Sequence, residues 1–392
     1  MQRVSMKKKL GIVNRLNPRD RYQWGRVKKR MHTFTAYNMM KVLQKYYDVQ
    51  WVEYSMAPLP KTVLLADRAW HRYLSRKRHM WLHTFLYAKN IAKAIDKSLE
   101  NSSLDVLFAP KGSAEVAFLQ TGIPVVYHSD ATFELVLDYL GPYKNMSKRS
   151  VVQGDEIERK AMHKAAHVML TTEWARESAL RYYQVPASKV TVVPSAGDLV
   201  RVPEKETLRW ERSGDTCQLL FVGVDWEGKG GPIALRTLEL LLTRGVDAHL
   251  TIVGSSPPSS YRHEQVTVVP FLNKHDPAEN RRFEALFRGA DFFLLPTRAE
   301  CGGICWGEAA AFALPSVTTD TGGVGGYVQE GINGILLPAE DVGEGYARAI
   351  CDLWHDRERY RMLRRSTREK YEKDLNWETW GQRARQIFDS LC

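Results

Sequence analysis

Cysteine is scarce in this chain, with five residues among 392. So few thiols exclude a scaffold held together by disulfides and favour a reducing compartment such as the cytoplasm. No run of about 18 apolar residues occurs, which excludes a membrane-spanning helix. Residues 1–16 are basic but lack an apolar stretch of about 7–15 residues, so a secretory signal is not expected.

Clusters of metal ligands are also missing. His79 and His83 are one helical turn apart, and Cys301 and Cys305 have the same spacing. Neither pair has the further ligands that a zinc site needs. We therefore expect no metal ion and no other bound cofactor.

Acidic residues are rare in the first quarter of the chain. Residues 1–100 contain 22 lysines and arginines but only six aspartates and glutamates, whereas the whole chain has a net charge of +11. The basic excess is most concentrated in residues 61–99, around Arg76, Lys77 and Arg78. The aromatic residues interleaved with these charges are Trp70, Tyr73, Trp81, Phe85 and Tyr87. This pattern predicts an anionic partner, namely a membrane surface, a phosphorylated acceptor or nucleic acid, with a solvated helix face as the alternative.

Short β-branched and aromatic runs alternate with longer helical patterns in two series. The first series of expected strands is 10–13, 49–54, 105–109, 124–128, 168–171 and 190–193. The second series is 218–222, 248–253, 266–270, 292–295, 316–319 and 335–337. Expected helices include 26–47, 113–121, 232–243, 277–289 and 377–391. Such alternation predicts an α/β protein with two doubly wound, Rossmann-like domains that face each other across one cleft. In domains of this kind, ligands bind beyond the carboxyl ends of the strands.

The expected domains are residues 1–198, residues 199–376 and a C-terminal helix over 377–392. Residues 199–216 are polar and contain no strand pattern, which is typical of a linker. Trp377, Trp380, Ile387 and Phe388 recur at helical spacing without a strand partner. We expect this last helix to pack back on the first domain.

The most informative segment runs from residue 291 to 338. Glu300 follows an apolar strand, and Gly302 and Gly303 lead into a helix that carries Glu308. Glycines at a helix start let phosphate oxygens reach free backbone N–H groups, which the helix dipole also favours. Two carboxylates beside them can accept hydrogen bonds from sugar and ribose hydroxyls. A further glycine loop, Gly322-Gly323, follows the next strand and adds more N–H groups.

These residues carry a resemblance to a known family. The two glutamates with seven residues between them, the following 309–315 run and the glycine pair 322–323 resemble the retaining glycosyltransferases of family 4, which have the GT-B fold. The resemblance implies that Glu300 holds hydroxyls of the donor sugar and that Glu308 holds the nucleotide ribose. The alternative is a helix-capping acid followed by a solvated helix acid.

A second motif opens the second series of strands. Gly223 follows a strand, and Lys229 lies in the glycine-rich turn before a helix. The resemblance implies that Lys229 neutralises the leaving nucleoside diphosphate. Many family members carry an arginine where this chain has Val224, so the second cationic contact is open, with Arg298 as a candidate. An exposed turn lysine is the alternative for Lys229.

In the first half, the resemblance points to the carboxyl end of the strand 124–128. It implies that His128 touches the donor sugar and phosphate, and Asp130 is a candidate for orienting its ring. The loop after the first strand contains one glycine, Gly25, beside Trp24. These two residues and Asp130 are candidates for the acceptor side.

The sequence therefore predicts a retaining glycosyltransferase that uses a nucleoside diphosphate sugar and a lipid-linked or anionic glycan acceptor. We expect it in the cytoplasm, peripherally bound to the anionic inner face of a membrane, with no nucleic acid as partner. Another GT-B enzyme, such as a phosphorylase or an epimerase, is the nearest alternative. A basic nucleic-acid-binding protein is a further one, although no helix-turn-helix, ribonucleoprotein or zinc-finger motif is present.

Overall fold

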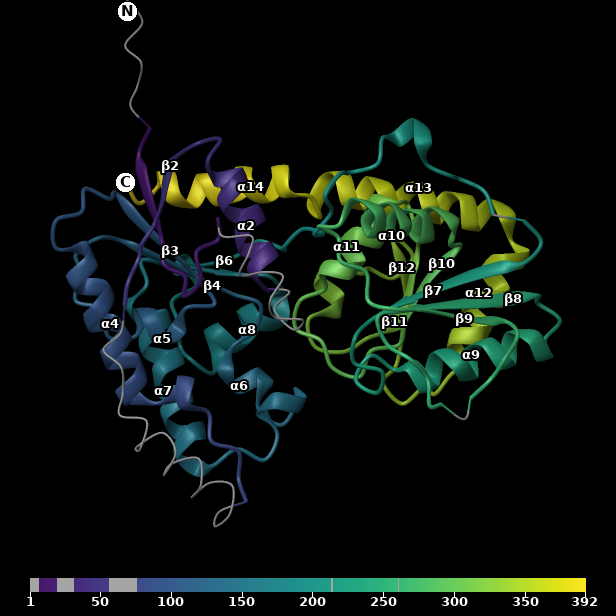
Figure 1. Ribbon diagram of the computed structural model, residues 1–392, viewed down its shortest axis with the longest axis horizontal. Helices are drawn as coiled ribbons and strands as arrows, with labels where there is room; N and C mark the ends of the chain where they lie inside the picture. The colour runs from purple at the N-terminus through teal and green to yellow at the C-terminus, as the bar shows by residue number, and fades with distance from the viewer. Residues whose placement is uncertain (1–6, 20–31, 56–75, 213, 260) are drawn as a thin grey trace, which may run out of the picture. The chain divides into compact units, whose positions relative to one another are not determined.

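The computed structural model describes residues 7–19, 32–55, 76–212, 214–259 and 261–392. The chain forms two compact units (Figure 1). Unit 1 comprises Met1–Val193 and Trp380–Cys392, and unit 2 comprises Pro194–Thr379. The acceptor-side candidates Trp24 and Gly25, and residues 61–75 of the basic segment, lie outside the described residues.

Unit 1 contains a six-stranded parallel sheet in the order β2-β1-β3-β4-β5-β6. Its strands are β1 (Lys9–Ile12), β2 (Asp48–Trp51), β3 (Val106–Pro110), β4 (Val125–Ser129), β5 (His167–Leu170) and β6 (Val190–Val192). The central strands β3 and β4 are buried almost throughout, as expected for a parallel sheet covered on both faces. Every strand expected in the first series is present within a few residues of its predicted bounds.

Unit 2 contains a second six-stranded parallel sheet in the order β12-β11-β10-β7-β8-β9. Its strands are β7 (Cys217–Val222), β8 (Ala248–Val253), β9 (Val266–Val269), β10 (Phe292–Leu295), β11 (Ser316–Thr319) and β12 (Gly334–Leu337). The strand order reverses at β7, with β10 on one side and β8 on the other. The predicted α/β class with two doubly wound sheets is therefore confirmed.

Helices connect the strands of both units. Those of unit 1 are α2 (His32–Leu43), α4 (Phe85–Leu99), α5 (Ser113–Val116), α6 (Phe133–Val136), α7 (Lys148–Lys164) and α8 (Glu173–Arg181). Thr84, Ser147 and Thr172 cap α4, α7 and α8, each through a side-chain oxygen that accepts from a backbone N–H of the first turn. The helix expected over residues 113–121 is shorter in the structure, where α5 ends at Val116.

The long helices of unit 2 are α9 (Gly231–Thr243), α10 (Pro277–Gly289), α11 (Ile304–Ala311), α12 (Glu344–His355) and α13 (Arg357–Asp374). Helices α9 and α12 pack on one face of the sheet, and α10, α11 and α13 lie on the other (Figure 1). Short 3-10 turns are η2 (Trp81–His83), η3 (Gly141–Tyr143), η4 (Ala187–Lys189), η5 (Lys205–Thr207) and η6 (Val324–Gly326). Among the described residues, no helix combines the length and the apolar character needed to cross a bilayer.

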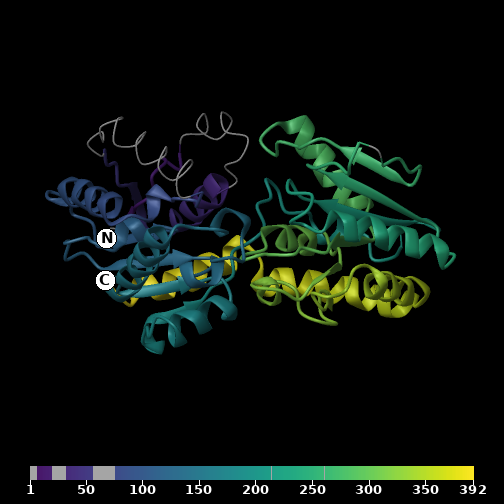
Figure 2. The same cartoon turned by 90° about the horizontal axis from the view of Figure 1, so that it is seen from below.

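The last helix, α14 (Trp377–Asp389), belongs to unit 1 from Trp380 onward. The ring centroid of Phe108 on β3 lies 6.1 Å from Trp380 and 5.5 Å from Phe388. Tyr47 Oη donates to the Asp389 carboxylate at 2.8 Å. The yellow helix accordingly lies against the blue and teal strands of unit 1 in both views (Figures 1 and 2). A segment far from β3 in the sequence thus completes the core of unit 1.

The division between the units falls ahead of the expected boundary after Asp198. Unit 2 begins at Pro194 and ends at Thr379. Ser195 N donates to Tyr327 Oη at 3.2 Å, and Gly197 O accepts from Trp377 Nε1 at 3.0 Å. These hydrogen bonds tie residues 194–198 and 377–379 to unit 2. The predicted boundary rested on the polar composition of residues 199–216, which contains no information about such contacts.

We predict that Phe388→Ala destabilises unit 1, because its ring is fully buried against Phe108. Removing a buried phenylalanine typically costs about 3–5 kcal/mol. The thermal melting curve should shift clearly to lower temperature. Gln386→Ala, on the exposed side of the same helix, is the matched control. Equal melting temperatures for the two variants would contradict the packing role of α14.

Candidate functional site

Three loops meet at one edge of the unit 2 sheet. They follow β7, β10 and β11, which are adjacent parallel strands and so end at the same edge. Arg298 N donates to Gly228 O at 2.9 Å, which ties the loop after β10 to the loop after β7. Gly323 N donates to Glu300 O at 2.9 Å, which ties the loop after β11 to the loop after β10. The glycine-rich segments and Glu300 are thereby held together.

The turn before α9 requires glycine at position 230. Gly230 has a φ of +74°, and a Cβ there would lie 1.8 Å from Pro296 O. Only a residue without a side chain permits both this left-handed conformation and this close approach. Gly223, at the other end of the loop, lies against the stem of Lys229. The loop therefore holds Lys229 close to the segment that follows β10.

Lys229 forms an ion pair with Glu300. Its ammonium donates to Glu300 Oε2, and both side chains are largely buried. Burial alone would lower the pKa of Lys229, but the Glu300 carboxylate, with that of Asp225, raises it above its ordinary value. Lys229 is thus positively charged at neutral pH. The structure brings these two predicted residues into direct contact.

Glu308 lies on α11 and is buried, with 3% of its surface exposed. Burial raises its pKa above the ordinary value, and the ammonium of Lys274 opposes this effect. Lys274 Nζ donates to Glu308 Oε1 and, at 3.2 Å, to Asp198 O. Lys274 was missed by the sequence analysis. The one available signal was its position in a loop that follows β9, and many other polar residues share that property.

Helix α11 begins between Glu300 and Glu308 in the sequence. Gly303 immediately precedes the helix, and a Cβ there would collide with the Trp306 ring. The first N–H groups of a helix lack partners inside it. Cys305 lies in the first turn of this helix, and the charges of Glu300, Lys229, Glu308 and Lys274 all act on its thiol. Burial, with the Glu300 charge, raises the pKa of Cys305 to about 12, so the thiol is uncharged.

The remaining unit 2 candidates surround the same edge. Gly302 and Gly322 are partly exposed, and Gly322 has a φ of +53°. Arg298 is exposed, and its charge acts on Tyr346 of α12. Val224 is also exposed, at 58%. Among the described basic residues, Lys229 pairs with Glu300 and Lys274 pairs with Glu308.

In unit 1, His128 ends β4 and is 2% exposed. Neither ring nitrogen has a hydrogen-bond partner within the described part of the chain. Burial lowers the pKa of His128 to about 4, so the ring is neutral at physiological pH. A neutral imidazole offers one donor and one acceptor. This buried ring is therefore able to exchange hydrogen bonds with a ligand.

Asp130 does not orient His128, contrary to the prediction. Its carboxylate forms an ion pair with Lys111 Nζ at 2.7 Å. Lys111 follows β3 with a φ of +56°, and its N–H donates to His128 O at 2.7 Å. The left-handed backbone at Lys111 carries its side chain to Asp130. The sequence did not reveal this pairing, because a positive φ at a lysine has no sequence signature.

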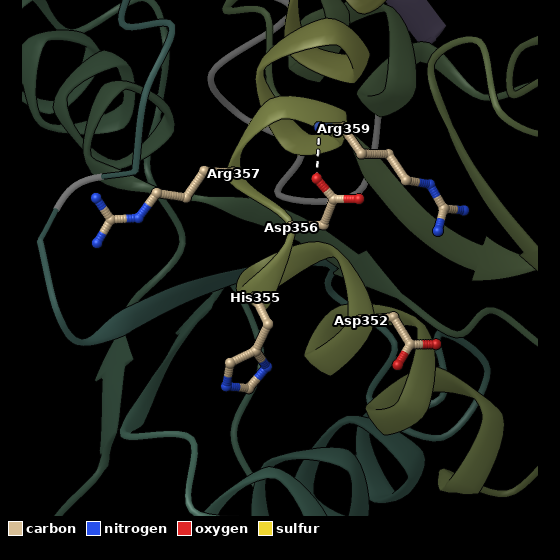
Figure 3. A pocket seen from close by; sticks show the side chains of 5 residues that line it. All are labelled: Asp352, His355, Asp356, Arg357 and Arg359. Atoms are coloured by element: carbon tan, nitrogen blue, oxygen red, sulfur yellow. Dashed lines mark hydrogen bonds between the residues drawn. The ribbon is translucent and has the colours of Figure 1, made fainter.

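A surface hollow lies away from these residues. A hollow of about 780 Å³ is lined by Asp352, His355, Asp356, Arg357 and Arg359, at the junction of α12 and α13. Figure 3 shows these side chains pointing apart, with Asp356 accepting from Arg359 N at 3.0 Å. None of the predicted site residues lines it. Among the described residues, no group of three or more His, Cys, Asp or Glu side chains is arranged to hold a metal ion.

Comparisons with protein families match both units. The model described as "Glycosyl transferases group 1" matches residues 216–356, and that described as "Glycosyl transferase 4-like domain" matches residues 100–196. Together they cover more than half of the chain. The first includes Lys229, Lys274, Glu300 and Glu308, and the second includes His128.

Individual proteins are similar at lower identity. A glycogen synthase of Mycobacterium tuberculosis is 28% identical over 51% of this chain and 48% of its own length. A D-inositol 3-phosphate glycosyltransferase of Paenarthrobacter aurescens is 26% identical over 52% of each chain. The chain thus spans about half the length of these curated relatives. The Anabaena protein HepE, solved with UDP and glucose, shares the fold with a TM-score of 0.62, covering 98% of this chain and 100% of its own at 14% identity.

We predict that Gly230→Ala disrupts the site. A Cβ at this position meets a backbone carbonyl, so the loop that carries Lys229 has to move. Gly245→Ala is the matched control, because Gly245 has a similar φ of +79° but open space around it. The control should cost about 1–2 kcal/mol for the left-handed conformation alone. Thermal or urea unfolding should show a clearly larger loss for Gly230→Ala, and equal losses would contradict the close packing of this turn.

Proposed function

We propose that this chain, which belongs to the family 4 type of GT-B glycosyltransferases, transfers a sugar from a nucleoside diphosphate sugar to a glycan acceptor with retention of configuration. Its family is defined by the group 1 and 4-like domains. The observation that carries this proposal is the joining of Lys229 and Glu300 beside the start of α11. A cation, a carboxylate and a helix N-terminus at one edge suit a phosphorylated sugar.

We propose that donor binding rearranges the Lys229–Glu300 pair. The diphosphate accepts hydrogen bonds from Lys229 and from the N–H groups at the start of α11. Glu300 is then free to accept from hydroxyls of the donor sugar, while Glu308 accepts from the ribose. His128 is the proposed ligand-binding group of unit 1, as a neutral donor and acceptor.

In the proposed reaction, the bond from the anomeric carbon to the diphosphate oxygen breaks and a bond to the acceptor oxygen forms on the same face. The acceptor hydroxyl gives its proton to the leaving phosphate. No protein nucleophile is needed. The chain contributes by positioning the donor and by stabilising the negative charge that develops on the leaving group, and such preorganised contacts are a large part of catalysis. We propose that Lys229 supplies this stabilisation without a metal ion.

We predict that Lys229→Met and Glu300→Gln each lower the transfer rate by about 10²–10³-fold, the usual loss for one preorganised charge contact. Transfer to acceptor should be measured at saturating donor, with EDTA present throughout. Glu227→Gln is the matched control, because Glu227 is exposed on the same loop as Lys229. Near-normal turnover of either site variant would refute the assignment. Loss of wild-type activity in EDTA, restored by magnesium or manganese, would refute the metal-free reaction.

The donor base follows from a binding screen. HepE was solved with UDP, so UDP-sugars are our first choice for this chain. A thermal-shift comparison of UDP-, GDP-, ADP- and CDP-sugars identifies the donor, since a ligand that binds the native state raises its melting temperature. A response to none of them, together with binding of orthophosphate or random RNA, would favour the phosphorylase or nucleic-acid alternatives.

We further propose that the acceptor is lipid-linked or anionic, and that unit 1 docks on the anionic inner face of a membrane in the cytoplasm. The support is a surface that we call the basic face: Arg76, Lys77, Arg78, Lys144, Lys148 and Arg149, all exposed. Two segments far apart in the sequence form it. Arg78 N donates to Asn145 O at 2.9 Å, and Ser147 N donates to Arg78 O at 2.8 Å.

Exposed apolar side chains accompany the basic face. Leu82, Leu86 and Val152 are 42%, 44% and 56% exposed. Along α4, Lys89, Lys93 and Lys97 lie on the exposed side, while Tyr87 is buried in the core. The prediction that Tyr87 faces a membrane is therefore wrong, because helical spacing turns it inward. Lysines and leucines on one exposed side suit an anionic lipid surface.

We predict that the protein sediments with anionic liposomes at low salt and is released as salt approaches about 0.15 M or above. Lys148→Ser with Arg149→Ser should weaken binding about 30-fold, because each basic residue near an anionic surface contributes about 1 kcal/mol. Neither side chain makes the contacts that join the two segments. Arg357→Ser with Arg359→Ser, on unit 2, is the control of equal charge. Protein that stays in the supernatant at low salt would refute membrane docking and favour a soluble acceptor.

A further inference from the structure

Glu308 presents a physical problem that Lys274, with help from the backbone N–H of Asp198, solves within the described structure. A carboxylate removed from water favours its neutral form unless a cation or several donors stabilise the charge. Glu308 is buried, and Lys274 is the charged side chain that bonds it. Lys274 itself is held in place by Asp198 O at 3.2 Å, and its ammonium lies 4.7 Å from the centre of the Phe283 ring.

Among the described residues, Lys274 is the cation that pairs with Glu308. The backbone N–H of Asp198 also donates a hydrogen bond to Glu308, and the uncharged thiol of Cys305 lies one turn earlier on α11. Lys229 pairs with Glu300 instead. On α13, Arg364 and Arg368 donate to the carbonyl groups of residues 312 and 311, at the other end of α11. The charge state of Glu308 therefore depends on Lys274.

We propose that Lys274 is a positioning residue that keeps Glu308 ionised and oriented to receive the ribose of the nucleotide. This inference rests on the proposed function, in which Glu308 accepts from the ribose diol. Lys274 occupies Oε1, and a carboxylate with two oxygens has room for further hydrogen bonds at Oε2. An ionised carboxylate accepts from both ribose hydroxyls, whereas a protonated one spends part of its capacity as a donor.

Removing the lysine charge should make nucleotide binding depend on pH in a new range. Burial raises the pKa of Glu308, and the Lys274 ammonium lowers it again. In Lys274→Met, this acid should take up its proton at a higher pH, by about 1–3 units for the loss of one adjacent opposite charge. Binding that requires the ionised form is then weak at neutral pH and recovers as the pH rises. In the wild type, it weakens only at lower pH.

The experiment measures dissociation constants from pH 5 to 9 for whichever of UDP, GDP, ADP or CDP binds the wild type, and for its 2′-deoxy form. Titration of the nucleotide phosphates affects the wild type and every variant equally, so it cancels when their dissociation constants are compared. Lys274→Met should shift the pH midpoint upward and lose the preference for ribose at neutral pH. Lys274→Arg should restore both. Arg281→Met, an exposed residue on α10, should behave as wild type.

Each outcome decides a different question. Binding of no nucleotide by the wild type would overturn the proposed function itself. Wild-type binding with equal weakening of Lys274→Met at every pH, for ribose and deoxyribose forms alike, would overturn the positioning role. Should Lys274→Met fail to fold, Glu308→Gln gives the answer, since it should abolish the acid limb of the wild-type pH profile and the ribose preference. A wild-type profile retained in Glu308→Gln would likewise overturn the inference.

Discussion

The candidate residues of unit 2 depend on one constraint, the adjacency of the parallel strands β11, β10 and β7. Parallel neighbours end at the same edge, so three loops with little sequence proximity emerge side by side. Backbone hydrogen bonds from Arg298 to Gly228 and from Gly323 to Glu300 then join them. If β7 and β10 paired elsewhere, Lys229 and Glu300 would not meet.

Two carboxylates at this edge are each balanced by a lysine from another loop. Glu300 pairs with Lys229, and Glu308 pairs with Lys274. Because largely buried charges are costly without a partner, the pairs lower the cost of keeping these acids away from water. The same arrangement suits ligand exchange, since a phosphate can replace a carboxylate on a lysine and release that carboxylate toward hydroxyls. In the proposed function, the same groups therefore serve stability without ligand and affinity for ligand.

Unit 1 offers a different kind of group. His128 is buried and neutral, and its ring nitrogens lack partners within the described structure. A buried polar atom without a hydrogen bond is costly and rare in native proteins, and it is common at functional positions. Lys111 and Asp130 form an ion pair nearby and leave the imidazole to other partners. This site therefore contrasts with the charged, mutually paired groups of unit 2.

The sequence by itself determined the twelve strands, the parallel α/β class and the glycine-rich turns, and its family resemblance singled out Lys229, Glu300, Glu308 and His128 as candidates. These features depend on local patterns: apolar runs, strand-to-helix spacing and the identity of residues just after strands. The tertiary structure alone decided which charges pair. Lys274 reaches Glu308, Lys111 takes Asp130, and Arg78 joins the segment around Asn145. Such contacts link residues tens of positions apart through side-chain reach and backbone conformation, for which the sequence contains no periodic signal.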